Sequence, residues 1–123
     1  MRFVLVCLAG AFGTGARYLL GGWAQRVWGL TFPYGTVVIN LLGSFLLVVV
    51  MSLGGRGVIG PDTRVILATG VMGGFTTYSA FNYETLRLLA NGSPGLAALN
   101  LLTTVVGCLL AGGLGFGLMR LLG

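Results

Sequence analysis

The sequence predicts an all-α membrane protein with four transmembrane helices. Of its 123 residues, 56% are hydrophobic and only 7% are charged, whereas a soluble domain carries about 25% charged residues. Four long apolar stretches, each long enough to cross a bilayer, are separated by short turns rich in glycine. The third stretch is interrupted near Gly73–Thr77. We therefore expect residues 1–123 to form a single integral membrane domain whose third helix is broken.

The first predicted helix covers residues 3–23 and contains one embedded charge, Arg17. A charge at membrane depth is costly unless it reaches the surface or finds polar partners. Two interpretations stay open: Arg17 is an interfacial anchor, or it is a cation at a pore mouth that attracts anions. Trp23 and Trp28 follow it, as is typical of aromatic residues at a membrane–water interface.

The second predicted helix covers residues 33–53, and one of its faces is polar. Thr36, Asn40, Gly43 and Ser44 stand at i, i+4, i+7 and i+8, which places them on one helical stripe. A polar stripe in a membrane faces protein or water rather than acyl chains. Asn40 either makes a helix–helix hydrogen bond, which contributes about 0.6–2 kcal/mol, or directs its amide donors into a pore.

The third predicted helix covers residues 65–89, and its middle is a poor helix former. Gly73 and Gly74 each cost about 1 kcal/mol relative to alanine inside a helix. Three residues whose hydroxyls compete for backbone hydrogen bonds follow at once: Thr76, Thr77 and Ser79. A break at membrane depth is tolerated where the freed backbone is buried in protein or lines a wet cavity. The alternative is an intact helix packed tightly on a neighbour, since Gly70 and Gly74 also make a small-xxx-small pair.

Short turns precede and follow this segment. Asp62 is expected to cap the N-terminus of the third helix. The fourth predicted helix covers residues 96–122, and helical spacing again places polar and small side chains on one face: Asn100, Thr103, Thr104, Gly107, Cys108 and Ala111. That face either holds helices together or lines a pathway. Two polar stripes beside a broken helix favour the pathway.

The residues around the break resemble the signature of a known family. The run Gly73-Gly74-Phe75-Thr76-Thr77-Tyr78-Ser79-Ala80-Phe81, followed by Glu84-Thr85, is similar to the motif of the small bacterial fluoride channels, the Fluc or CrcB family. Positions in the other three segments agree, namely Arg17-Tyr18, Gly35-Thr36 with Asn40 and Gly43-Ser44, and Asn100 with Thr104. The resemblance covers the whole chain and all four segments.

The resemblance implies a channel that passively exports cytoplasmic fluoride across the bacterial inner membrane and confers fluoride resistance. It implies these pore residues: Arg17, Asn40, Thr77, Tyr78, Ser79, Phe81, Asn100 and Thr104. In the family, two aromatic ring edges line the fluoride path, and a ring edge is electrostatically positive. This chain departs from the usual pattern at two positions, with Tyr78 where phenylalanine is common and Ala80 where a hydroxyl residue is common.

A structural sodium ion is also implied, held by backbone carbonyls where two subunits meet, at positions that match Gly73 and Thr76. Carbonyls freed by a break are hard oxygen ligands that suit such a cation. We expect an antiparallel, dual-topology homodimer, because one chain of four helices is too thin to wall a pore. The arginines are divided weakly between the two ends, which permits insertion in either direction.

The composition excludes several other classes of protein. The chain has no histidine, and its two cysteines, Cys7 and Cys108, both fall inside apolar runs far apart; Cys7 is expected to be a small buried apolar residue. Neither a metal site with nitrogen and sulfur ligands nor a catalytic nucleophile–base pair is expected, so we predict that the protein is not an enzyme. The net charge of +5 is spread too thinly to bind nucleic acid, and the arginines are expected to face lipid headgroups of the bilayer.

Two other functions compete with a channel. A small proton-coupled exporter of cationic drugs also has four helices, but it needs a carboxylate inside the membrane that protons and substrate share. Glu84 is the only candidate for that carboxylate. A structural membrane subunit without transport activity would leave the polar stripes as helix–helix contacts.

Overall fold

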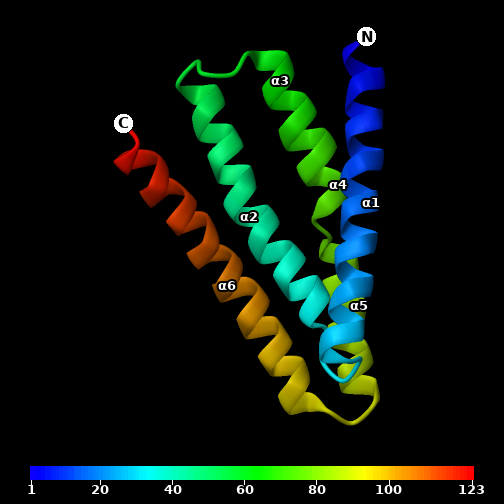
Figure 1. Cartoon of the computed structure of the whole chain (residues 1–123). Coiled ribbons are helices and arrows are strands. Elements are labelled where there is room, and N and C mark those ends of the chain that lie inside the picture. Colours follow the sequence, from blue (N-terminus) through cyan, green and yellow to red (C-terminus); the bar gives the residue numbers. More distant parts are fainter.

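The computed structural model describes residues 1–123 as helices joined by short turns, without a β-strand (Figure 1). Three helices are long and apolar enough to cross a membrane, namely α1 (Arg2–Trp28), α2 (Tyr34–Gly55) and α6 (Pro94–Leu121). Both ends of the chain lie at the same end of the bundle (Figure 1). The predicted all-helical membrane class is confirmed.

The remaining helical segment is broken, as predicted. Three short pieces follow one another without a gap, and α5 begins after two further residues: α3 (Pro61–Val65), the π-helix η1 (Ile66–Met72), α4 (Gly73–Phe75) and α5 (Tyr78–Ala90). The backbone is extended at Thr76 (φ −81°, ψ 154°) and at Thr77 (φ −150°, ψ 112°). Of these pieces, η1 and α4 pack against α1, whereas α5 packs against α6 (Figure 1).

The break lies after the glycine pair rather than within it. Gly73 keeps a helical conformation, with φ −62° and ψ −36°. A Cβ atom added to Gly74 would lie 2.3 Å from the Gly10 carbonyl oxygen, and one added to Gly13 would lie 2.1 Å from the Val71 carbonyl oxygen. The glycines therefore bring α1 against η1 and α4. The interpretation of an intact helix is therefore wrong, because the chain is extended at Thr76 and Thr77, but the tight glycine packing that it included is present before the break.

Some expectations about helix ends and side chains are wrong. α1 continues through Trp28, so Trp28 lies on the helix, where its ring meets that of Trp23 edge to face at 5.3 Å. Asp62 does not cap α3, because Pro61 takes the first helical position and Gly60 the cap; Asp62 instead accepts a hydrogen bond from Arg2 Nη1 at 3.0 Å. Cys7 is exposed on the surface of α1 instead of buried.

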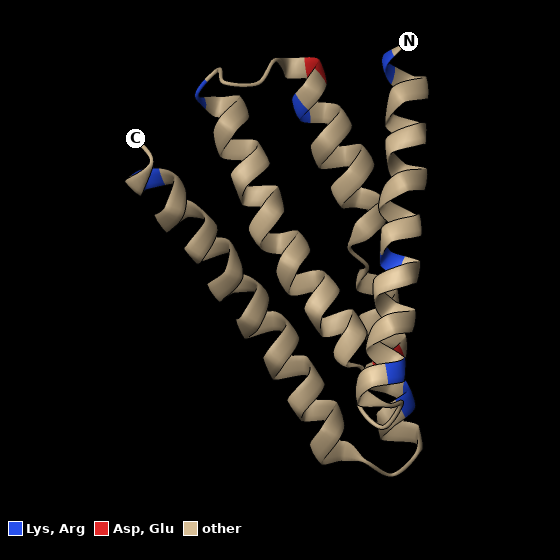
Figure 2. Ribbon diagram, in the orientation of Figure 1, with Lys and Arg blue, Asp and Glu red and all other residues tan.

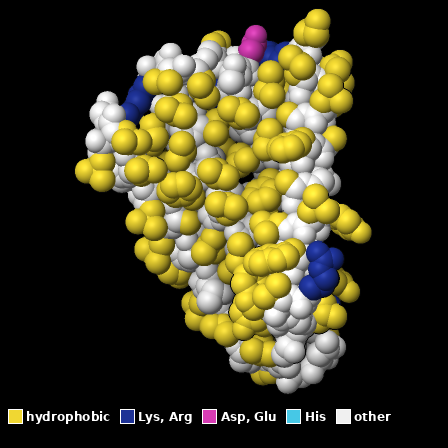
Figure 3. Space-filling model, in the orientation of Figure 1, with side chains coloured by type: hydrophobic (Ala, Val, Ile, Leu, Met, Phe, Trp, Pro, Cys, Tyr) yellow, Lys and Arg dark blue, Asp and Glu magenta, His cyan; other side chains and the backbone are white.

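The surface of the single chain is strongly apolar (Figure 3). Only 16 of the 123 residues are buried, and most of the large apolar side chains point outward. Charged residues are concentrated towards the two ends of the bundle, with one basic residue nearer its middle (Figure 2). An apolar surface between charged ends is that of a multi-pass membrane protein, whose sides are covered by lipid or by another chain.

Candidate functional site

The break is held open by one side chain, Asn40 of α2. The Thr77 backbone N–H donates to Asn40 Oδ1 at 2.8 Å, and Asn40 Nδ2 donates to the Thr77 carbonyl at 3.0 Å. The Asn40 amide thus pairs with both backbone groups of one extended residue. Asn40 is 8% exposed, so this pairing takes place inside the bundle. The sequence predicted an amide at this depth but not that it would hold the break.

The break removes helical hydrogen-bond donors from backbone carbonyls. In an unbroken α-helix the Thr77 N–H would donate to the Gly73 carbonyl, and the Ala80 N–H would donate to the Thr76 carbonyl. Instead, Thr77 N–H donates to Asn40, and Ala80 N–H donates to Thr77 Oγ1 at 3.2 Å, which caps α5. The break therefore frees the carbonyls of Gly73 and Thr76, and also that of Phe75, to which the Ser79 N–H does not donate. Gly73 and Thr76 are the two positions predicted for a cation, although binding stays a prediction.

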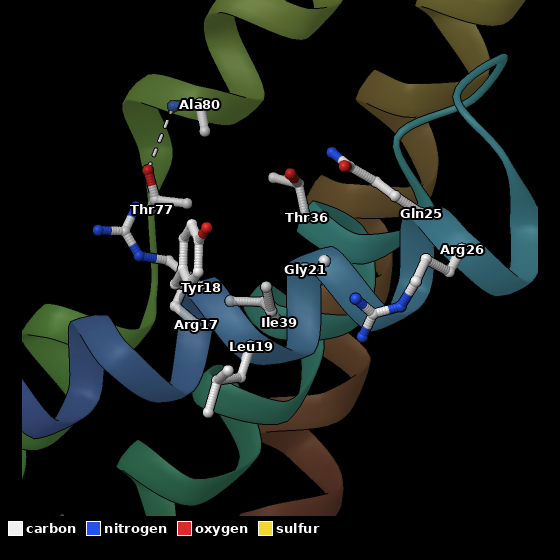
Figure 4. Close-up of a pocket in the computed structure, with 11 residues that line it drawn as sticks. Arg17, Tyr18, Leu19, Gly21, Gln25, Arg26, Thr36, Ile39, Thr77 and Ala80 are labelled. Carbon is white, nitrogen blue, oxygen red and sulfur yellow. Dashed lines mark hydrogen bonds between the residues drawn. The ribbon is translucent and has the colours of Figure 1, made fainter.

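The Gly74 carbonyl, between those two, has partners on α1. It accepts hydrogen bonds from Arg17 Nε at 3.1 Å and from Thr14 Oγ1 at 3.5 Å. Arg17 thus finds the polar partner that an embedded charge needs. Its two terminal nitrogens make no hydrogen bond within the chain, and its guanidinium lies near Thr77 (Figure 4). One guanidinium nitrogen, Nε, thus holds the Arg17 side chain at the break, and the side chain also lines the space beside the break.

That space is a cavity of about 350 Å³, which we call the Arg17 cavity. Its lining comes from α1, α2 and the region of the break (Figure 4): the polar side chains are those of Arg17, Tyr18, Gln25, Arg26, Thr36 and Thr77. Of the predicted pore residues, Arg17 and Thr77 line it. No acidic side chain does.

A second cavity of about 300 Å³, the Phe81 cavity, lies on the other side of Thr77. It brings together five of the predicted pore residues: Asn40, Thr77, Tyr78, Phe81 and Thr104. Ser44 of the polar stripe on α2 also lines it. Because Thr77 borders both cavities, the break is the place where they approach each other.

The two aromatic rings in this cavity differ in how firmly they are held. Tyr78 and Phe81 contact each other edge to face, with centroids 5.7 Å apart and planes at 67°. Phe81 is 5% exposed, whereas Tyr78 is 78% exposed. Packing fixes the Phe81 ring, while the Tyr78 ring lies on the surface of the single chain.

Ser79 and Asn100, also predicted as pore residues, line neither cavity. Asn100 is fully buried, and its Nδ2 donates to Thr85 Oγ1 at 2.9 Å. Thr85 Oγ1 in turn donates to the Phe81 carbonyl at 2.8 Å. Asn100 therefore joins α6 to α5 close to the Phe81 backbone. Ser79 is exposed, with its hydroxyl 3.3 Å from that of Thr77.

The partner of Thr36, which is the carboxyl group of Glu84, was not predicted from the sequence. Thr36 Oγ1 donates to Glu84 Oε1 at 2.8 Å, while Glu84 Oε2 is buried without a donor. The contacts of Thr14, Thr85, Gln25 and Arg26 at the site were not predicted either. The spacing of Arg17, Gly21 and Gln25 at i, i+4 and i+8 could have indicated a common face on α1.

Taken together, the fold and the site define a helical membrane protein with a broken segment flanked by two cavities. Their lining supplies hydroxyls, two side-chain amides, ring edges and two guanidinium groups, and no carboxylate. That set of groups suits an anion rather than a cation.

Comparison with known proteins agrees with this class. The model of the family described as CrcB-like protein, Camphor Resistance (CrcB), matches residues 4–116. A protein of Anaeromyxobacter sp. strain K is 56% identical over 111 residues, 89% of this chain and 88% of that relative. One of Sorangium cellulosum strain So ce56 is 47% identical over 120 residues, 97% of this chain and 94% of the relative. One of Thermus thermophilus is 47% identical over 98 residues, 80% of this chain and 77% of the relative.

The chain belongs to the CrcB family, as the motif around the break predicted. All three relatives carry the name fluoride-specific ion channel FluC. The family is one of ion channels, so the prediction that the protein is not an enzyme is confirmed. The comparisons give no support to a proton-coupled exporter.

Substituting Asn40 by leucine should destabilise the protein, because the Thr77 N–H and carbonyl would both lose their partner inside the bundle. Each buried group left unsatisfied costs about 1–3 kcal/mol. The measurement is thermal unfolding of the purified protein in detergent. Asn82→Leu, which removes an exposed amide on α5, is the matched control and should change stability little. Equal unfolding temperatures for Asn40→Leu and the control would show that the amide does not hold the break.

Proposed function

We propose that this chain is a fluoride-selective channel through which fluoride leaves the cytoplasm passively across a bacterial inner membrane. The observation that carries the proposal is the Phe81 cavity, in a chain whose relatives are named fluoride-specific ion channels. Fluoride accumulates in cells because neutral HF crosses membranes and then dissociates inside. A passive path for the anion lowers that accumulation, which would confer resistance.

The chemistry of the cavities supports an anion that is small and strongly hydrated. Such an ion gives up its water only where close donors replace it. Asn40 has two N–H groups, of which one is needed for the Thr77 carbonyl and the other remains available. Thr104 and Ser44 add hydroxyls, and Phe81 adds a positive ring edge. Arg17 contributes the positive charge nearest the break.

The direct test of this proposal is ion efflux from liposomes that contain the purified protein. Fluoride should leave rapidly and chloride should not, because the larger ion fits the close donors poorly. A fluoride electrode and a chloride electrode measure the two rates. Liposomes that lose both ions equally fast, or neither, would contradict a fluoride-selective channel.

The same assay examines the ring edge. Phe81→Ile keeps apolar bulk but removes the positive edge, so fluoride efflux should fall by about tenfold or more. A tenfold fall corresponds to about 1.4 kcal/mol of lost stabilisation of the ion. Phe12→Ile is the matched control, since Phe12 is an exposed apolar side chain on α1. Fluoride efflux through this variant should match that of the unmodified protein. Unchanged efflux in a folded Phe81→Ile variant would show that Phe81 is a core residue and does not line the pore.

The proposal includes a structural sodium ion at the break. The freed carbonyls of Gly73 and Thr76 are oxygen ligands of the right kind, and Gly73 is exposed on the surface of the single chain. Two oxygens are too few for a sodium ion, so a second copy of the chain would supply the rest. No group of three or more acidic, histidine or cysteine side chains could form another metal site.

Sodium bound in this way would stabilise the folded protein, because it binds the native state and not the unfolded chain. Thermal unfolding in sodium buffer should therefore occur at higher temperature than in a buffer whose only cation is N-methylglucamine, at equal ionic strength. Identical unfolding temperatures in the two buffers would remove the sodium site from the proposal.

The functional unit that we propose is an antiparallel homodimer in which α3, η1, α4 and α5 together make a fourth span. Both chain ends lie at one end of the bundle, as an even number of spans requires (Figure 1). The extended backbone at the break needs protein on its open side, because lipid cannot satisfy it. Basic residues at both ends of the bundle permit either orientation (Figure 2).

Cysteine labelling tests the arrangement. Ser93→Cys, on a Cys7→Ala and Cys108→Ala background, places one reactive thiol in the turn before α6. In intact cells a membrane-impermeant maleimide should reach about half of the copies, since the twofold axis of such a dimer lies in the membrane plane. Labelling of all copies, or of none, would establish a single orientation.

A further inference from the structure

The Arg17 cavity has a basic residue at each end. Arg17 lies at the end next to the break, and Arg26 lies at the other end, with Gly21 between them (Figure 4). Gln25 and Thr36 add polar groups along the wall. Arg26 is exposed near the end of α1, and it makes no ion pair. Its charge is therefore not neutralised by an acidic neighbour.

Between the two arginines the wall contributed by α1 includes a pair of adjacent glycines, Gly21 and Gly22, beside Tyr18, Leu19 and Gln25. Two adjacent glycines inside a helix cost about 1 kcal/mol each relative to alanine. A Cβ atom added to Gly22 would meet nothing within 4 Å, and one added to Gly21 would meet only the Ile39 side chain, at 3.8 Å. Packing within the chain does not require these glycines, in contrast to Gly13 and Gly74. Their effect is to keep the cavity open between Arg26 and Arg17.

The nearest acidic group lies outside this cavity. Glu84 and Arg87 of α5 line a smaller neighbouring cavity of about 130 Å³, which shares Gly21, Gln25 and Thr36 with the Arg17 cavity. The Thr36 hydroxyl donates to Glu84 Oε1. Thr36 therefore stands between the carboxyl group and the space in front of the arginines, so an anion in the Arg17 cavity meets guanidinium groups first.

We propose that Arg26 is the entry residue of the anion path. It attracts small monovalent inorganic anions from water to the outer end of the Arg17 cavity, and they pass over the glycine pair to Arg17 and Thr77. This inference rests on the proposed channel function and adds to it the route by which the ion reaches the break. The charge of Arg26 raises the rate at which ions reach the cavity, whereas selection among ions takes place at the Phe81 cavity.

The test compares fluoride efflux of Arg26→Gln with the unmodified protein in liposomes at two ionic strengths, set with potassium gluconate. The Debye length is about 30 Å at 0.01 M and about 3 Å at 1 M, so the attraction acts only at low salt. At low salt the initial rate should fall about fivefold, which corresponds to the Coulomb energy of one charge near the surface in water. At high salt the two rates should be equal.

Arg120→Gln is the matched control, because it removes one arginine from the far end of α6, which does not line the Arg17 cavity. Its efflux should equal that of the unmodified protein at both ionic strengths. An Arg26→Gln variant that matches this control at low salt, or one whose loss persists at high salt, would overturn the entry role. Absence of fluoride efflux from the unmodified protein would instead refute the channel function itself.

A second variant tests the route independently of charge. Gly22→Leu adds a side chain that lines the cavity at a position where the new Cβ atom would meet nothing within 4 Å, so it should slow efflux at both ionic strengths without loss of folding. Gly95→Leu, which adds the same side chain in open space at the start of α6, is the control. Size-exclusion elution and thermal unfolding establish that both variants are folded. Unimpaired efflux in folded Gly22→Leu would show that ions do not pass over the glycine pair.

Discussion

The rest of the structure depends on the pairing of the Asn40 side chain with the Thr77 backbone. A helix broken in a membrane leaves polar groups that lipid cannot satisfy, at a cost of several kcal/mol for each group. Asn40 satisfies both groups of Thr77 from a neighbouring helix. Because Thr77 is held extended, α5 starts anew with the Thr77 hydroxyl as its cap. The positions of Tyr78 and Phe81 at the start of α5 follow from that cap.

Tight packing on the other side of the break has a complementary effect. The glycines of α1 and those of η1 and α4 allow backbone contact, which places Arg17 within hydrogen-bonding distance of the Gly74 carbonyl. Without that approach the guanidinium would need water or lipid headgroups as partners. The glycine contact thus determines where a half-buried positive charge lies, and the charge in turn lies beside the cavity that the break leaves open.

Much of this was available from the sequence. Hydropathy and turn residues predicted the apolar segments, and helical spacing placed Asn40 and Thr104 on polar faces, because these signals are local. The break at Thr76 and Thr77 lies within the predicted range Gly73–Thr77. The hydroxyl residues indicated it correctly, whereas the glycines of that range pack against α1, which a helix propensity considered without its neighbour does not show. The bracing role of Asn40 and the position of Arg26 on a cavity depend on how α1, α2 and α5 pack. No single segment contains that information.

Among the residues that we propose for the ion path, some also hold the fold and others do not. Thr77 uses its N–H, carbonyl and hydroxyl oxygen for Asn40 and for the cap of α5, so the groups nearest both cavities are already fixed before an ion arrives. Fixed donors need no rearrangement to stabilise a charge, which favours fast passage. Because Asn40 holds the Thr77 backbone, a substitution of Asn40 that lowers ion flux could act through folding as well as through conduction. Arg26 makes no ion pair and Gly22 has no side chain, so we expect changes there to act on the proposed path without loss of folding.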